Sequence, residues 1–151
     1  MPTAAAFLFL AVVSLVSATL LPAQAVRGEL SVADAGATSL LAYRHAVLDF
    51  LNANPAFAGT VPDAALAFTW GYRRDPRWTN FVQSAGTLYV YEVSPSPVRT
   101  SQVLDQLHRK TLSSFSVGRN AAGTLVSANG FGTGIAVPPV VPNGAIVMVG
   151  R

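Results

Sequence analysis

Histidine is the side chain best suited to proton transfer near neutral pH, because its unperturbed pKa is close to 6.5. The chain has two, His45 and His108, which fall in different predicted helices with no cluster of carboxylates beside either. The seven acidic residues are scattered, so no pair for general acid–base catalysis is visible, and no Gly-x-Ser-x-Gly serine elbow occurs. The sequence therefore predicts no catalytic residue and no enzymatic activity.

Metal and cofactor sites are not predicted either. The sequence has no cysteine, its two histidines are far apart, and it contains no calcium-loop pattern. A glycine-rich stretch, Gly130–Gly134, lacks the lysine of a phosphate-binding loop and does not join a strong strand to a helix. We interpret it as a flexible turn, so no cofactor and no metal ligand are expected.

One short segment rich in tryptophan, tyrosine and arginine is a candidate binding site, because these residue types are enriched at interface hot spots. The candidate partner-contact residues are Trp70, Tyr72, Arg73, Arg74, Arg77 and Trp78. The alternative interpretation is that both tryptophans belong to the core and the arginines are solvated. The basic patch is interrupted by Asp75 and is too short for the basic stripe of a nucleic-acid binder, so no nucleic-acid partner is expected.

The composition is that of a folded chain with few charges. Of the 151 residues, 51% are hydrophobic and 11% are charged, whereas a typical soluble domain has about 25% charged residues. Such a chain is not intrinsically disordered. Either its surface is poor in charge, or part of that surface is meant to be covered.

Residues 4–21 form a near-continuous apolar run, and the first charged side chain is Arg27. A membrane-spanning helix needs about 20 apolar residues, with a range of about 17–25, so the run reaches the low end of that range. Ala23 and Ala25 match the small-residue pattern of a signal-peptide cut, but the basic region that precedes the apolar part is missing. An uncleaved membrane anchor is favoured over a cleaved signal. Both interpretations place the remaining chain outside the cytoplasm of a bacterium.

The spacing of apolar residues predicts a long helix after this segment. Leu40 and Tyr43 belong to a face that repeats every three or four residues. We expect a helix over residues 32–52, started by a capping box at Ser31–Asp34 and ended before Pro55.

Runs of β-branched and aromatic residues predict strands in the rest of the chain. The strongest signal is residues 87–93, which are apolar on both faces and predict a central strand covered by a helix. Ser101 is predicted to cap a second helix over residues 101–110. The other predicted strands are residues 65–70, 78–83, 112–119, 124–128, 134–137 and 145–149, with a hairpin turn at 120–123.

This order of elements predicts the α+β class: an N-terminal hydrophobic segment, a long helix, and a mostly antiparallel sheet with a second helix packed on it. We assign residues 1–25 to the membrane anchor or signal segment. Residues 26–151 are assigned to one periplasmic α+β domain.

Several short motifs are spread along the chain. They are Ala42-Tyr43-Arg44, Asn54-Pro55, Gly86-Thr87-Leu88-Tyr89-Val90-Tyr91, Ile135-Ala136-Val137-Pro138 and Val141-Pro142-Asn143-Gly144-Ala145-Ile146-Val147. In these motifs and in its layout, the chain resembles the small PilM family of type IV thin-pilus biogenesis proteins of conjugative plasmids and integrative elements. The resemblance implies an inner-membrane or periplasmic component of the pilus assembly machinery without known catalysis. It supplies no functional residues to carry over.

The expected function is therefore a non-enzymatic role in type IV pilus biogenesis. The expected partners are other pilus-assembly or envelope proteins, with the membrane contacted through residues 4–21. The expected location is the inner membrane facing the periplasm, or the periplasm if the N-terminal segment is cleaved.

Two other functions are considered. A minor pilin or pseudopilin-like subunit would carry a glutamate at the fifth position of its mature helix, where this chain, counted from Phe7, has Ala11. A periplasmic ligand-binding or enzymatic domain would need a pocket with converging polar groups.

Overall fold

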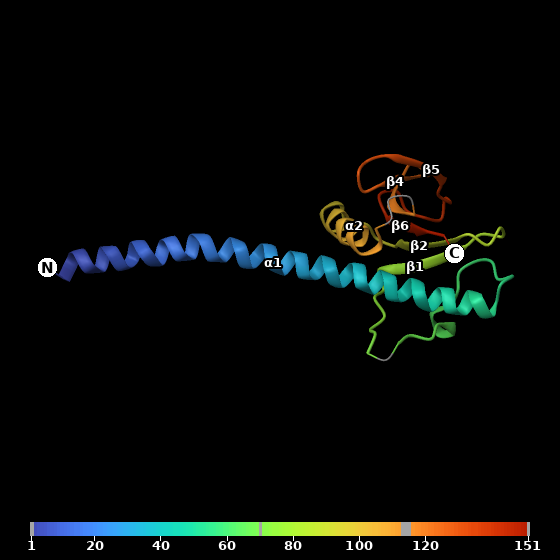
Figure 1. Cartoon of the computed structure of the whole chain (residues 1–151), viewed down its shortest axis with the longest axis horizontal. Coiled ribbons are helices and arrows are strands. Elements are labelled where there is room, and N and C mark those ends of the chain that lie inside the picture. Colours follow the sequence, from blue (N-terminus) through green and yellow to red (C-terminus); the bar gives the residue numbers. More distant parts are fainter. Residues whose placement is uncertain (1, 70, 113–115, 151) are drawn as a thin grey trace. The chain divides into compact units, whose positions relative to one another are not determined.

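The structure is a computed structural model that describes residues 2–69, 71–112 and 116–150, with side chains described from Arg27 onward. The chain divides into two compact units, Met1–Val32 and Ala33–Arg151, and the second unit contains the sheet (Figure 1). The elements are α1 (Pro2–Ala53), a short 3₁₀ helix η1 (Asp63–Ala65), β1 (Trp78–Val82), β2 (Leu88–Glu92), α2 (Pro97–Thr111), β3 (Val117–Ala121), β4 (Thr124–Ser127), β5 (Gly132–Ala136) and β6 (Ile146–Val149).

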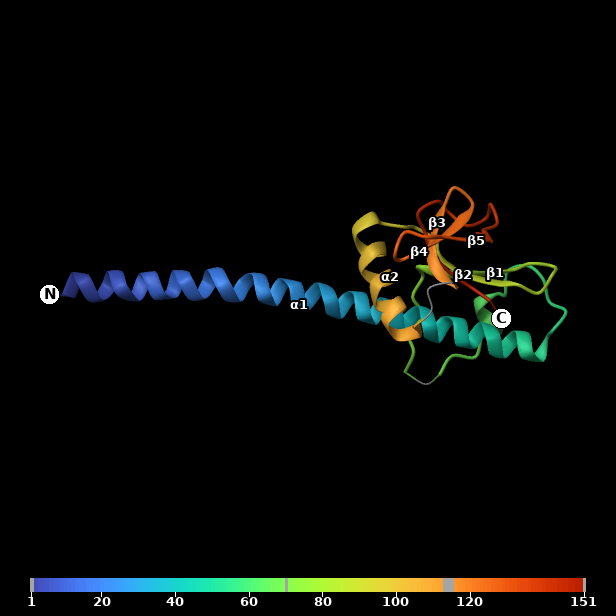
Figure 2. The same cartoon turned by 45° about the horizontal axis from the view of Figure 1, so that its top comes forward.

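The strands form a six-stranded sheet in the order β1-β2-β6-β3-β4-β5, and every neighbouring pair is antiparallel. The α+β prediction is confirmed. The last strand in the sequence, β6, lies between β2 and β3, so the C-terminal segment joins the two halves of the sheet. In Figure 1 the end of α1 runs beneath β1 and β2, and in Figure 2 α2 stands beside the β3–β4 hairpin.

The apolar face of α1 packs on one side of the sheet. Its buried positions include Leu40, Tyr43, Val47 and Leu51, which recur at the predicted spacing of three or four residues. The helix ends at Ala53, and the Asn54 side-chain amide donates a hydrogen bond to the Phe50 carbonyl at 2.9 Å. The predicted end of this helix is confirmed within one residue.

The predicted start of that helix is wrong. Ser31 and Asp34 lie inside α1, so the sequence that resembles a capping box does not begin a helix. A capping box starts a helix only where the residue at the cap leaves the helical conformation, and here the chain is already helical before Ser31.

All five residues of β2 are buried, as the apolar sequence of residues 87–93 predicts for a central strand. Leu88 and Val90 face the core shared with α1 and α2. Tyr89 and Tyr91 face a second core on the opposite side of the sheet, built from strand and loop residues. A helical cover is therefore confirmed for one face only.

The predicted strand at residues 65–70 is wrong. Asp63–Ala65 form the 3₁₀ helix η1, and residues 66–69 have no regular structure. The Phe68 ring stacks on Tyr43 at a centroid distance of 6.2 Å and on Tyr72 at 4.8 Å. This segment is thus fixed by aromatic packing against α1, which its sequence does not distinguish from a β ladder.

The second helix begins earlier than predicted, and the strand that follows it begins later than predicted. α2 starts at Pro97 with Ser96 in the cap position, because proline suits the first turn of a helix, where its missing N–H costs nothing. At the other end, Leu112 takes a left-handed conformation, and its N–H bonds to the His108 carbonyl. The predicted strand start at residue 112 is therefore wrong, and β3 begins at Val117.

The predicted hairpin at residues 120–123 is confirmed. β3 and β4 are joined by Ala122 and Gly123, whose φ angles are 50° and 85°. Positive φ at both central residues is the pattern of a type I′ turn, which favours Asn-Gly. Asn120 supports the turn by accepting a hydrogen bond from the Gly123 N–H at 2.9 Å.

Ala122→Asn is expected to stabilise the protein by about 0.5–1 kcal/mol, because asparagine tolerates the left-handed conformation that alanine resists. Ala122→Val should lower the free energy of unfolding, since a β-branched side chain fits this conformation worse. Urea unfolding of both variants measures the effect. Equal stability of the two variants would contradict the turn assignment.

In the part of the chain that the structure describes, no helix is both long enough and apolar enough to cross a membrane. The side chains of the predicted anchor, residues 4–21, lie outside the described set. The boundary between residues 25 and 26 stays a prediction.

Candidate partner-binding site

The candidate residues around position 74 divide into buried and exposed positions. Trp78 is fully buried in β1 and belongs to the helix-side core. Tyr72 is half-buried, and its hydroxyl donates to the Ser39 carbonyl at 3.3 Å. Arg73 is exposed, and Trp70 lies outside the described residues. The expectation that Trp78 is available to a partner is therefore wrong, because its side chain is fully buried in the core.

Arg74 and Arg77 make hydrogen bonds and ion pairs that hold this loop in place. The Arg74 Nε donates to Asp63 Oδ2 at 2.9 Å, its Nη2 donates to the Trp78 carbonyl at 2.6 Å, and its guanidinium lies 4.5 Å from the centre of the Tyr43 ring. The Arg77 Nη2 donates to Asp75 Oδ2 at 2.7 Å. The Arg74 contacts join the loop to α1 and to η1, and the Arg77 contact lies within the loop.

The ion pair within the loop changes the titration of its members. Burial alone would raise the pKa of Asp75, but the hydrogen bonds and charge of Arg77 outweigh it and hold that pKa below its usual value. The hydrogen bond to Asp75 raises the pKa of Arg77. Both groups therefore remain charged at neutral pH and form a partly buried ion pair. Contact of this loop with a partner stays a prediction, and Arg73 is its exposed arginine.

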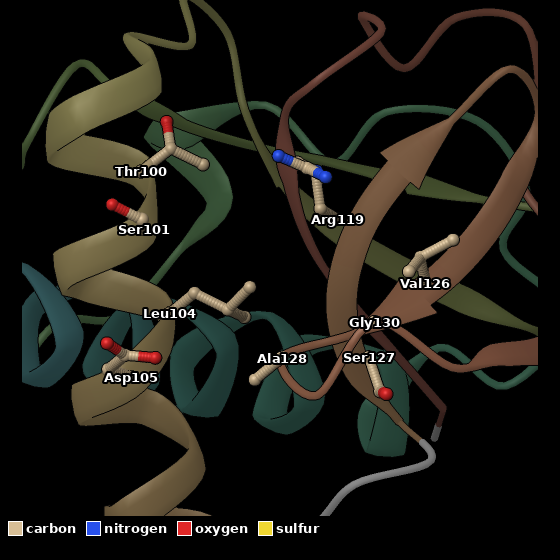
Figure 3. A pocket seen from close by; sticks show the side chains of 9 residues that line it. All are labelled: Thr100, Ser101, Leu104, Asp105, Arg119, Val126, Ser127, Ala128 and Gly130. Carbon is tan, nitrogen blue, oxygen red and sulfur yellow. The ribbon is translucent and has the colours of Figure 1, made fainter.

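A groove lies between α2 and the β3–β4 hairpin, with a volume of about 130 Å³ (Figure 3). Ser101, Leu104 and Asp105 contribute from α2, and Arg119 and Val126 contribute from the hairpin. Ala128 and Gly130, in the turn after β4, also line the pocket. We call this site the α2–hairpin groove.

The α2–hairpin groove contains charges that no other part of the described chain neutralises. Arg119 and Asp105 are both exposed, and the side chain of neither forms a hydrogen bond or ion pair with a described residue. Ser127 is buried, and its hydroxyl accepts a hydrogen bond from the Phe131 N–H at 3.3 Å. The groove therefore offers a guanidinium donor on the hairpin side and a carboxylate acceptor on the helix side.

A buried carboxylate lies behind the groove. Glu92 is 1% exposed, and the Thr100 hydroxyl, which also lines the groove, donates to its Oε2 at 2.9 Å. Burial raises the pKa of Glu92, and the hydrogen bond from Thr100 and the charge of Arg77 oppose that rise. Thr100 is thus held in place by its bond to Glu92, which fixes this part of the groove wall.

Both edges of the sheet are occupied or irregular. Along β1, Gly59 and Val82 exchange backbone hydrogen bonds of 2.8 and 2.9 Å, so the loop before η1 covers part of that edge. At the other edge, the pairing of β4 with β5 shifts register between Thr124 and Val126. Irregular and covered edges discourage the addition of a strand from another protein. A partner is therefore expected to contact side-chain surfaces such as the groove.

Metal binding has no candidate in the described chain, where no three His, Cys, Asp or Glu side chains gather closely enough to hold an ion. His45 pairs with Asp49 at 3.6 Å on an exposed part of α1. His108 lies on α2, so the two histidines belong to different helices, as the sequence predicts.

The groove residues were not identified from the sequence. Arg119 and Asp105 come from different elements, and nothing in their spacing indicates that they line one pocket. One signal was available: Phe131 stands between two glycines in a turn and is 72% exposed. An aromatic residue in a glycine-rich turn is a candidate contact. The interpretation of Gly130–Gly134 as a flexible turn leaves this residue out.

The fold defines a small α+β domain in which two helices cover one face of an antiparallel sheet. The sequence profile of the PilM family matches residues 7–149, so the chain belongs to the PilM family. No curated protein sequence matches the chain.

Solved structures similar to the chain include two PilM proteins. A PilM protein from Escherichia coli B7A is 20% identical, with a TM-score of 0.58 over 80% of this chain and 92% of that one, and it supports the fold. A PilM protein from Pseudomonas aeruginosa 2192 is 31% identical over 76% of this chain and 94% of that one, with a TM-score of 0.43.

Proposed function

We propose that the protein is a non-enzymatic component of type IV pilus biogenesis that binds other pilus proteins. Its membership of the PilM family supports a pilus-related role. The observation that carries the proposal is the α2–hairpin groove, where Arg119 and Asp105 have no partner among the described residues. A volume of about 130 Å³ is below the roughly 300–1,000 Å³ of small-molecule pockets. The groove therefore suits a side chain of a partner protein better than a substrate.

The proposed location is the inner membrane, with the folded unit facing the periplasm, or the periplasm if the N-terminal segment is cleaved. The apolar run over residues 4–21 supports this location, because a stretch of that length and composition is typical of an anchor or an export signal. The absence of cysteine is compatible with either side of the membrane.

Deletion of the gene in its pilus-producing host, followed by complementation with the full chain, tests the proposed function. We expect the deletion to abolish pili, the full chain to restore them, and an affinity-tagged full chain to co-purify with envelope pilus proteins from detergent-solubilised membranes. Normal numbers of pili in the deletion strain would contradict the proposal.

A further inference from the structure

We infer that the α2–hairpin groove binds an acidic side chain of a partner protein, with Arg119 as its counter-charge and Phe131 as an apolar contact at the rim. This inference rests on the proposed function and names the partner chemistry of that site. Three observations support the inference: the charges of the folded unit, the size of the groove, and the place of Phe131 next to Gly130.

The charge inventory shows a basic surplus at the surface. Among the described residues from 33 to 150, every acidic side chain except Asp105 contacts a basic or hydroxyl group. These contacts are Asp34 with Lys110, Asp49 with His45, Asp63 with Arg74, Asp75 with Arg77, and Glu92 with Thr100. The arginines without a hydrogen bond or ion pair in the same described range are Arg73, Arg99, Arg109 and Arg119. A surface whose free charges are mainly arginines is complementary to an acidic partner.

Of these free arginines, Arg119 lines the α2–hairpin groove. It belongs to β3, where it is paired with Val126 of β4 and Ile146 of β6, so its backbone is fixed on both sides. In Figure 3 its guanidinium lies in the space between the hairpin and α2. A planar guanidinium can bind a carboxylate with two parallel hydrogen bonds.

Asp105 determines how such a side chain enters. It lies on the α2 side of the same groove, and its negative charge repels an incoming carboxylate. The acidic side chain is therefore directed to the hairpin side, where Arg119 lies. Asp105 remains free to accept a hydrogen bond from a backbone N–H or a basic side chain of the same partner. Opposite charges on facing walls fix the orientation of the partner.

Phe131 supplies the apolar part of the contact. It is 72% exposed and directly follows Gly130, which lines the groove. Covering an exposed aromatic side chain favours binding, because its apolar surface leaves water. A protein interface needs such an apolar contact beside a charged one, because a solvated ion pair alone contributes little.

Photo-crosslinking in living cells tests this inference. The photoreactive amino acid p-benzoylphenylalanine is placed at position 131 of the full chain, in a strain carrying the complete set of pilus genes, and at Thr60 as an exposed control. We expect position 131 to crosslink to one pilus protein and Thr60 not to do so. Peptide mass spectrometry should place the crosslink within a few residues of an Asp or Glu of that protein.

Charge-reversal variants test whether the contact is acidic, because a crosslink alone does not identify the residue that contacts Arg119. Arg119→Glu should lower the crosslink yield about tenfold, and Arg119→Lys should retain most of it. Changing the nearby acidic residue of the captured protein to lysine should restore the yield with Arg119→Glu. Circular dichroism and thermal melting of the purified variants check that each is folded.

Three results would overturn the inference: no crosslink from position 131 in cells that form pili, a yield unchanged by folded Arg119→Glu, or a captured surface without acidic residues. If deletion of the gene still abolishes pili in that case, the proposed function stands and only the role of the groove is lost.

Discussion

Asn80→Ala is expected to lower the free energy of unfolding by about 3 kcal/mol, because it leaves buried backbone groups without partners. Asn80 is fully buried in β1. Its Oδ1 accepts from the Val61 N–H at 2.8 Å, and its Nδ2 donates to the Val61 carbonyl at 3.0 Å and to the Tyr43 hydroxyl at 2.8 Å. One side chain thus joins α1, β1 and the loop before η1.

The matched control is Asn52→Ala, which makes the same chemical change at an exposed position of α1. It should change the free energy of unfolding by no more than about 0.5 kcal/mol. Urea denaturation followed by circular dichroism measures both variants. If Asn80→Ala were as stable as the control, the three hydrogen bonds of Asn80 would not hold the loop in place.

Gly118→Ala is expected to destabilise the protein by about 3 kcal/mol or more, because the added methyl group overlaps the neighbouring strand. A Cβ at Gly118 would lie 2.3 Å from the Val126 carbonyl oxygen and 3.1 Å from the Leu125 side chain. Backbone atoms of β4 cannot move away without disturbing the β3–β4 ladder. Since Arg119 follows Gly118, the same change should also displace one wall of the α2–hairpin groove.

Gly132→Ala in β5 provides the comparison, because no atom lies within 4 Å of the corresponding Cβ. It should be neutral within about 0.5 kcal/mol, since alanine suits a strand no worse than glycine does. Thermal unfolding of the two variants distinguishes steric overlap from a general cost of changing a glycine. Equal melting temperatures would show that β3 and β4 do not approach as closely as described.

Much of the fold could be predicted from the sequence because local patterns coincide with the packing. The three-and-four spacing around Tyr43 predicts the buried face of α1, and the β-branched and aromatic run in β2 predicts a doubly buried strand. The polar break at Asn120–Gly123 likewise predicts the hairpin. In each case the same residues determine both the local structure and the burial.

The errors occur where tertiary contacts override a local pattern. Residues 66–69 resemble a strand, but aromatic packing of Phe68 on Tyr43 holds them without a ladder. Ser101 resembles a helix cap, but Pro97 starts the helix a turn earlier, and the Ser101 hydroxyl donates to the Val98 carbonyl instead. The position of β6 between β2 and β3 depends on contacts far apart in the sequence, which no local pattern records.

The candidate site was harder to predict than the fold. Residue types alone pointed to the loop around Arg74, yet Arg74 and Arg77 form internal contacts there, and Trp78 is in the core. The groove depends instead on Asp105 and Arg119, which are brought to one pocket by the packing of α2 against β3. A charge becomes a candidate contact only when its internal partners are known, and that requires the three-dimensional structure.

Pilus formation by two charge-reversal variants tests the binding role of the groove most directly. Arg119→Glu and Arg109→Glu make the same change at two exposed arginines without internal partners among the described residues, one in the groove and one near the end of α2, outside the residues that line the groove. Each full-length variant is expressed in the deletion strain, its level is matched by immunoblotting, and pili are counted by electron microscopy. We expect Arg119→Glu to lose pili and Arg109→Glu to retain them. Normal pili with a folded Arg119→Glu variant, in a strain that has none without the protein, would contradict a binding role for the groove.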